Sequence, residues 1–286
     1  MLIKKFSSPM RKNTFFISMQ KVLPQALLSR IAGMLANTKQ SSVKNFLIKL
    51  AIKRFGIDLS EAIRQSPDDY QSFNDFFTRK LKPEARLIDQ DKNTITSPAD
   101  GEMTQCGKIH DKQLIQAKGK GFSVDHLTAQ SSTTSFTDFA TIYLSPKDYH
   151  RVHMPMDGRL TKMVYIPGRL FSVNALTSQH IDALFAKNER LVCYFETSIG
   201  EIAVIFVGAM LVAGIVTSWH KMVTPNYMKT IESWDYSQQN ICFAKGEEIG
   251  YFNFGSTIIC LFPDNHATCI NQEKHVQMGQ IIAKIS

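Results

Sequence analysis

Three separated segments of the chain carry a serine, two histidines and an aspartate that together suit acyl chemistry. Ser256 lies within a strand-like run of aromatic and β-branched residues. Asp100 follows Pro98-Ala99, while His150 and His153 occupy one short run. A serine hydroxyl is a weak nucleophile until a base takes its proton and a third group orients that base. These residue types therefore make a Ser-His-Asp site one interpretation.

Each member also has a simpler interpretation. Gly255, directly before Ser256, marks either a kink in a strand or a point where another group approaches the backbone. An Asp before a Gly is common in turns. Two histidines spaced by three residues suit a zinc site or a polar network. No convincing third zinc ligand accompanies His150 and His153, so we expect no metal.

The candidate residues lie inside longer motifs. These are Ser97–Glu102, Gln116–Gly119, Leu144–Pro155, Pro167–Asn174, Asn188–Arg190, Val207–Ala209 and the Phe-Gly-Ser-Thr segment at 254–257. In order and spacing they closely resemble the phosphatidylserine decarboxylases, pyruvoyl-dependent enzymes, in their short bacterial form. The resemblance covers the chain from about Leu23 to its end. It is far more specific than any single motif.

The resemblance implies that the chain cuts itself at the Gly255-Ser256 bond. Ser256 would attack the carbonyl of Gly255, with His153 as the base and Asp100 orienting it. Elimination would then release residues 1–255 (β chain) from residues 256–286 (α chain). Ser256 would become a covalent pyruvoyl group, so the protein would make its own cofactor.

The resemblance also implies the reaction. A Schiff base between the pyruvoyl group and phosphatidylserine would allow loss of CO2, giving phosphatidylethanolamine. His150 is our candidate for the acid that protonates the product, although the division of work between His150 and His153 stays open. Lys147 and Arg151 are candidates for attracting the substrate phosphate, or are solvated surface charges.

The elements that must position these residues begin with a basic arm. Residues 1–57 contain eleven Lys and Arg and no Asp or Glu, whereas 22 basic and 25 acidic residues follow. Apolar residues recur at helical spacing from Leu23 to Leu35, and again from Val43 to Ala51 beside Lys44 and Lys49. Two basic amphipathic helices are typical of proteins that lie at a membrane interface. The alternative is that both apolar faces pack on the protein's own core.

We therefore predict an α+β protein with two regions. Residues 1–85 would form a basic amphipathic helical membrane-associating region that includes a short helix at 72–79. Residues 86–286 would form a β-rich, largely antiparallel catalytic domain, with strands at 112–117, 139–145, 159–166, 191–195, 202–216, 249–262 and 276–285. A helix is expected near 182–188. The apolar run Ile202–Val216 is shorter than the roughly 18 residues of a membrane span, and its glycines predict two buried strands around a bend.

The sequence further predicts the setting of the protein. Its five cysteines, without a C-x-x-C pair, favour free thiols in a reducing compartment. We expect a peripheral membrane protein on the cytoplasmic face of the bacterial inner membrane, with phosphatidylserine and an anionic membrane surface as partners and no nucleic acid. The processed α and β chains are expected to associate, and relatives suggest a homodimer of such pairs.

Two other functions compete with a decarboxylase. A membrane-associated lipid serine hydrolase would keep Ser256 intact, but the chain lacks a Gly-x-Ser-x-Gly elbow around it. A non-catalytic membrane adaptor would use the basic arm alone. Such an adaptor would have no reason to carry the decarboxylase motifs.

Overall fold

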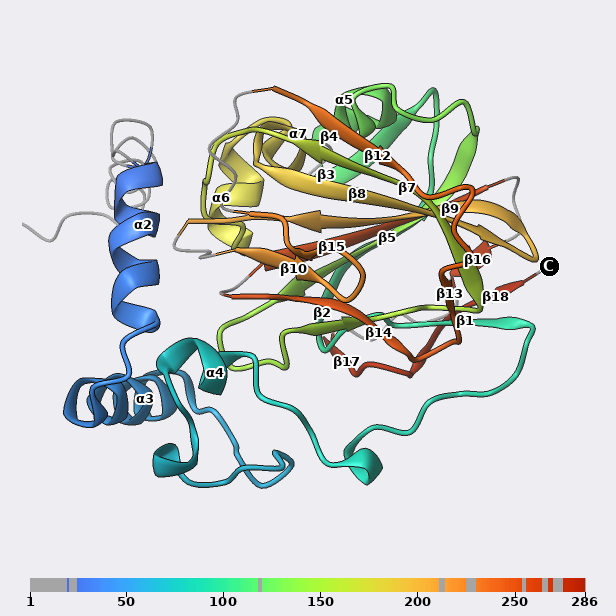
Figure 1. The fold of residues 1–286 in the computed structure, drawn as a ribbon. Coiled ribbons are helices and arrows are strands. Elements are labelled where there is room, and N and C mark those ends of the chain that lie inside the picture. Colours follow the sequence, from blue (N-terminus) through green and yellow to red (C-terminus); the bar gives the residue numbers. More distant parts are fainter. Residues whose placement is uncertain are drawn as a thin grey trace, which may run out of the picture.

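The computed structural model describes residue 20 and residues 25–117, 120–210, 214–224, 230–253, 256–263, 267–269 and 275–285. Leu23, Phe254 and Gly255, which the sequence singled out, lie outside these ranges. The described part is an α+β protein. Its longer helices come first, and a body of antiparallel sheets follows (Figure 1).

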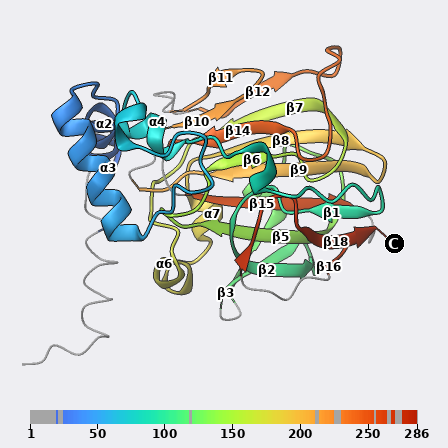
Figure 2. The ribbon, with the colours of Figure 1, turned by 90° about the horizontal axis from the view of Figure 1, so that it is seen from below.

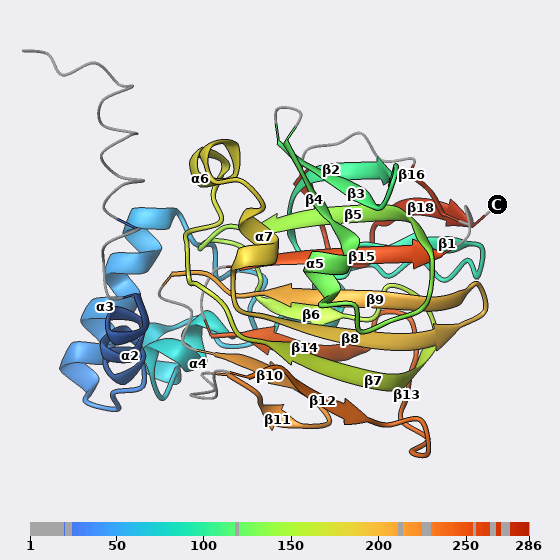
Figure 3. The same cartoon turned by 90° about the horizontal axis from the view of Figure 1, so that it is seen from above.

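The helical arm consists of α2 (Gln25–Ala36), α3 (Ser41–Phe55) and α4 (Phe73–Phe77), with 3-10 turns at Pro67–Asp69 and Pro83–Ala85. Helix α3 ends where Gly56 takes a left-handed conformation (φ 67°). Helix α4 begins at Ser72, whose hydroxyl accepts a hydrogen bond from the Asp75 amide as an N-cap. The arm lies at one end of the body, opposite the end where the C-terminus emerges (Figures 1 and 3).

The arm has a small core of its own, built around Ile48, Tyr70 and Phe76. Lys44 is buried beside this core, and its ammonium donates hydrogen bonds to the carbonyls of Pro67, Asp68 and Tyr70. Lys44 therefore ties α3 to the following turn. The prediction that Lys44 flanks an exposed apolar face is wrong, because its helical position points it at these carbonyls.

Among the described residues, the main sheet has nine strands in the order β12-β7-β8-β9-β15-β5-β2-β17, with β13 also paired to β7. All its pairs are antiparallel. The bounds are β2 Gly101–Lys108, β5 Phe136–Leu144, β7 Gly158–Ile166, β8 Arg190–Thr197, β9 Gly200–Val207, β12 Glu232–Asp235, β13 Cys242–Phe243, β15 Ser256–Pro263 and β17 His275–Val276. The predicted largely antiparallel body is confirmed.

Three smaller sheets and three short helices make up the rest of the body as far as the structure describes it. A four-stranded sheet has the order β11-β10-β14-β6, a three-stranded sheet the order β1-β18-β16, and β3 pairs with β4. Their bounds are β1 Thr94–Thr96, β3 Gln113–Ala117, β4 Lys120–Ser123, β6 Arg151–His153, β10 Ile215–Thr217, β11 Lys221–Met222, β14 Glu248–Phe252, β16 Ala267–Cys269 and β18 Ile281–Ile285. The helices are α5 Val124–Thr128, α6 Ala175–His180 and α7 Leu184–Lys187. Figure 2 shows α4 between the two long helices and the strands.

Strand β15 lies at the centre of the main sheet, and all eight of its residues are buried. It pairs with β5 on one side and β9 on the other. Its continuous apolar and β-branched run suits a strand covered on both faces. The run Ile202–Val216 contains the end of β9 and the start of β10, as its glycines predicted. Within the described residues, no helix has the length and apolar character needed to cross a membrane.

The cysteine prediction needs correction. Cys106 in β2 and Cys269 in β16 form a disulfide, although they lie 163 positions apart in the sequence. Cys193, Cys242 and Cys260 are free thiols, as expected. The pairing depends on β16 lying beside β2, which the spacing of the cysteines did not reveal.

Candidate functional site

Ser256 is the first residue of β15 and pairs with Leu144 at the end of β5. Its side chain is fully buried (0% exposed), and its Oγ has no hydrogen-bond partner in the described structure. A buried hydroxyl without a partner is costly, and such groups in native proteins often mark a functional site. Strand β15 runs from the end of the sheet that faces the helical arm (Figure 3). Gly255, the other half of the predicted cleavage bond, lies outside the described residues.

His150 lies just before β6 and is also fully buried. Its ring packs on Phe77 of α4, with ring centroids 4.1 Å apart. Nδ1 lies 2.9 Å from the Asp148 carbonyl, which only accepts, so Nδ1 carries the proton and Nε2 does not. Nε2 has no partner in the described structure. Burial lowers the pKa of His150 to about 3, so this imidazole is neutral at pH 7.

His153 ends β6 and is buried as well. Its Nδ1 donates to the Gly246 carbonyl at 2.8 Å, and its Nε2 accepts from the Tyr149 hydroxyl at 3.1 Å. Burial lowers the pKa of His153, so it too is held neutral. The neutral Nε2 of His153 is able to take a proton, but in this structure it already accepts a hydrogen bond from the Tyr149 hydroxyl.

Asp100 lies directly before β2 and is buried. Its carboxylate accepts from Arg86, with Nη2 at 2.5 Å and Nε at 2.9 Å, and from the Met278 amide at 2.8 Å. Asp100 and His153, both of which the structure describes, form no hydrogen bond with each other. The structure thus brings the predicted residues to one end of the sheets, but Gly246 orients His153 and Arg86 holds Asp100.

The two candidate phosphate-binding cations differ in their surroundings. Arg151 is largely buried, forms an ion pair with Glu248 at 2.5 Å and donates to the Thr78 carbonyl at 2.9 Å. The Lys147 side chain is exposed and lines a hollow of about 200 Å³. Lys147 is therefore open to an anion, while Arg151 is engaged in holding α4 to the body.

The sequence missed Arg79 and Arg86, which also line this hollow with Asp100. Arg79 is only 3% exposed and donates from Nη2 to the carbonyls of Lys147 (2.8 Å) and Asp148 (3.3 Å). Its Nε and Nη1 have no partner in the described structure, and burial lowers its pKa. The Asp148 carbonyl thus accepts from both Arg79 and His150. No sequence motif signalled either arginine, because their roles depend on loops distant in sequence.

Comparisons with known proteins match nearly the whole chain to one family. A family model described as phosphatidylserine decarboxylase matches residues 73–284, and a second, described as PSD, matches residues 15–56. A phosphatidylserine decarboxylase proenzyme of Francisella tularensis subsp. novicida is 58% identical over 281 residues, covering 96% of this chain and 99% of its own length. A proenzyme of the same name from Francisella philomiragia is 59% identical over 279 residues with the same coverage. The chain belongs to the phosphatidylserine decarboxylase family.

Proposed function

We propose that this chain converts phosphatidylserine to phosphatidylethanolamine and CO2 after cutting itself at the Gly255-Ser256 bond. The observation that carries the proposal is the Oγ of Ser256 at the start of the central strand, which is buried and has no hydrogen-bond partner among the described residues. Membership of the decarboxylase family and the proenzyme name of its relatives support it. The neutral imidazoles of His150 and His153 lie at the same end of the body.

In the proposed cleavage, Ser256 Oγ attacks the Gly255 carbonyl carbon while His153 Nε2 takes the hydroxyl proton. For this, the Tyr149 hydroxyl moves from Nε2 or relays the proton. The acyl group moves from the nitrogen to Oγ, so the amide becomes an ester and the nitrogen of residue 256 becomes a free amine. Elimination then removes the Cα proton of residue 256 and breaks the Cβ–Oγ bond, which leaves Gly255 with a carboxylate. Water then converts the new N-terminal residue to a pyruvoyl group with loss of ammonia. Asp100 acts in the precursor as a fixed negative charge held by Arg86.

Ser256 Oγ and His150 Nε2 both lack hydrogen-bond partners among the described residues, so neither of these two atoms is engaged in a structural hydrogen bond. A pyruvoyl group at position 256 would supply the electron sink for decarboxylation. His150 Nε2, unprotonated at neutral pH, takes a proton from the substrate ammonium and returns it to carbon after CO2 leaves. Arg79 positions His150 through their shared bonds to the Asp148 carbonyl. Lys147 attracts the substrate phosphate at the mouth of the hollow, with Arg151 as the second candidate.

The helical arm delivers the protein to its lipid substrate. Apolar side chains on α2 and α3 are 42–65% exposed, namely Leu27, Ile31, Met34, Leu35, Phe46 and Leu50. Exposed cations accompany them: Arg30, Lys39, Lys49, Lys53 and Arg54. An apolar face with flanking cations suits an anionic membrane interface. We accordingly assign residues 1–85 to membrane contact and residues 86–286 to catalysis, with the arm and the Ser256 end of β15 on the same side.

The first test is intact mass spectrometry of the denatured, reduced protein beside a Ser256→Ala variant. We expect two chains, the smaller being residues 256–286 with a mass lower by one ammonia than a serine-started peptide. Ser256→Ala should stay a single chain. A single wild-type chain that still decarboxylates phosphatidylserine would refute the mechanism, and an intact chain that hydrolyses lipid esters would favour the hydrolase.

Two histidine variants separate the proposed steps. His153→Ala should block cleavage, whereas His150→Ala should cleave and then fail to release CO2 from phosphatidylserine. The same mass measurement and a CO2 assay report the two steps independently. Cleavage lost in His150→Ala but retained in His153→Ala would reverse the assignment. The cytoplasmic face and the homodimer stay predictions, which protease protection in membrane vesicles and mass photometry would check.

A further inference from the structure

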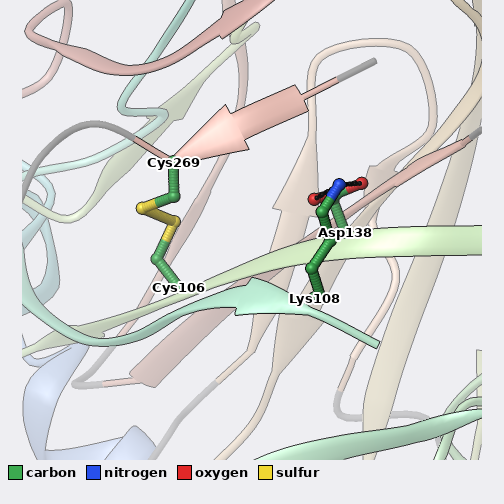
Figure 4. Close-up of a disulfide and its surroundings, with 4 residues drawn as sticks. All are labelled: Cys106, Lys108, Asp138 and Cys269. Atoms are coloured by element: carbon green, nitrogen blue, oxygen red, sulfur yellow. Dashed lines mark hydrogen bonds and ion pairs between the residues drawn. A yellow bond between two sulfur atoms is a disulfide. The ribbon is translucent and has the colours of Figure 1, made fainter. Parts of the chain in front are cut away.

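One covalent link joins two distant parts of the body. Cys106 in β2 and Cys269 in β16 form a disulfide, with Cα atoms 6.2 Å apart (Figure 4). Strand β16 belongs to the three-stranded sheet, where it pairs with β18. Both cysteines lie away from Ser256. In the main sheet Cys106 faces Ala140 of β5, whereas Ser256 faces Leu144 at the end of that strand.

The proposed cleavage point falls between these two cysteines in sequence. Cys106 belongs to residues 1–255 and Cys269 to residues 256–286. We propose that the Cys106–Cys269 bond becomes a redox-responsive covalent tether between the two chains of the processed enzyme. This inference rests on the proposed cleavage, without which the bond only closes a loop within one chain.

The native fold already holds the two chains together without the bond. Strand β15 of the shorter chain lies between β5 and β9 of the longer one. Strand β17 pairs with β2, and the Met278 amide donates to Asp100. The tether therefore adds little to assembly while the sheet is intact. Its effect appears when the strands separate, because the α chain then stays attached to β2.

Formation of the bond is a two-electron oxidation. The two thiols lose two protons and two electrons to a low-molecular-weight disulfide such as oxidised glutathione, which becomes two molecules of thiol. A reductant reverses the step by thiol–disulfide exchange. Among the other cysteines, Cys193 and Cys260 are buried, and burial raises their pKa values, which disfavours the reactive thiolate. Cys242 is exposed and serves as the matched control.

The test uses full-length protein purified after processing and incubated with either oxidised glutathione or dithiothreitol. Remaining thiols are blocked with N-ethylmaleimide in denaturant, and the samples are compared by non-reducing gel electrophoresis and intact mass. We expect one species after oxidation, with the summed mass of both chains, and two species after reduction. Cys106→Ser and Cys269→Ser should each give two species under both conditions, and Cys242→Ser should behave as wild type.

The outcomes separate failure of the tether from failure of the cleavage. Two species after oxidation of the wild type would overturn the tether while leaving the cleavage intact. A crosslink that persists in Cys106→Ser would overturn it as well. A single species even after reduction would show that the chain is uncleaved, which refutes the proposed function and the tether together.

Refolding gives a second readout. After dilution from urea, the oxidised enzyme should regain activity with a yield independent of protein concentration, because its two chains stay joined. The reduced enzyme and Cys269→Ser should lose yield as the protein is diluted, since two separate chains must meet. Equal concentration dependence in the oxidised and reduced forms would overturn the tether.

Discussion

The body and the helical arm use similar apolar residues in opposite ways. In β15 every residue is buried, and the strand is paired on both sides. In α2 and α3 the small core takes Ile48 and Ala51, yet Leu35 and Phe46 stay more than half exposed. Burial of β15 stabilises the fold, whereas burial of the exposed arm side chains needs a surface outside the described chain.

The two regions also differ in how polar groups contribute. The arm is tied internally by a charged side chain, Lys44, which donates to three carbonyls. In the body, Ser256 Oγ and His150 Nε2 are buried and have no hydrogen-bond partner within the part of the chain that the structure describes. The separation between the two regions is not complete, because Arg79 of the arm also has buried nitrogen atoms without a hydrogen-bond partner among the described residues.

The largest effect on stability is expected when a buried side chain of β15 is shortened. Ile259→Ala should lower the free energy of unfolding by about 2–5 kcal/mol, because a fully buried side chain leaves a cavity. Urea unfolding in a Ser256→Ala background keeps the chain in one piece for the measurement. Leu35→Ala is the matched arm variant and should change stability by less than about 0.5 kcal/mol. Equal losses of unfolding free energy in Ile259→Ala and Leu35→Ala would contradict the proposed difference between the body and the arm.

Membrane binding should show the reverse pattern. The triple variant Leu27→Ser, Leu35→Ser and Phe46→Ser should bind phosphatidylserine vesicles at least about 100-fold more weakly, since each apolar side chain contributes about 1.5–3 kcal/mol when fully buried and more than half of each is exposed on the arm. Vesicle sedimentation at two salt concentrations measures both the apolar and the electrostatic contribution. Met222→Ser, an exposed apolar residue of the body, should bind like wild type. Unchanged vesicle binding of the triple variant would show that the apolar face of the arm does not contact the membrane.

Lys44 tests whether the arm depends on polar bonds for its fold. Lys44→Met should lower the free energy of unfolding by about 2–4 kcal/mol, because buried carbonyls lose their donor. Lys49→Met, at an exposed position of the same helix, should stay within about 0.5 kcal/mol of wild type. Urea unfolding of both variants provides the measurement. Equal urea midpoints for Lys44→Met and Lys49→Met would show that the hydrogen bonds of Lys44 do not stabilise the fold.

The last prediction concerns the dependence of stability on pH. Burial lowers the pKa of His150 from 6.5 to about 3, so between these values the unfolded chain binds a proton that the folded chain does not. Stability should therefore fall as the pH falls through this window, with His150 contributing up to about 1.4 kcal/mol per pH unit. His150→Gln in the Ser256→Ala background should flatten the slope measured by urea unfolding. His110→Gln, at an exposed position, should leave it unchanged, and equal slopes in both variants would contradict the assignment.

Much of the fold was predictable because its signals are local. The stretch 72–79 predicted the short helix α4, and the glycines of the run 202–216 predicted two strands in place of one long element. The run 249–262 was predicted as one strand and is two, β14 and β15, in different sheets. Alternation and β-branching reveal a strand, but they carry no information about which sheet it joins.

The site was predictable only in part. Motif resemblance singled out Ser256, Asp100, His150 and His153 and led to the family that the comparisons confirm. The pairing of Asp100 with Arg86, and of His153 with Gly246 and Tyr149, was missed. Those partners come from loops whose approach depends on the packed sheets.

The sequence by itself determined the α+β order, the antiparallel body, the basic arm and the family, because each rests on residue types at short spacing. Only the tertiary structure decided that Cys106 meets Cys269, that Lys44 is buried, and that the apolar face of the arm stays exposed. Such outcomes depend on which segments become neighbours, and that is set by the whole packed chain and not by any local pattern.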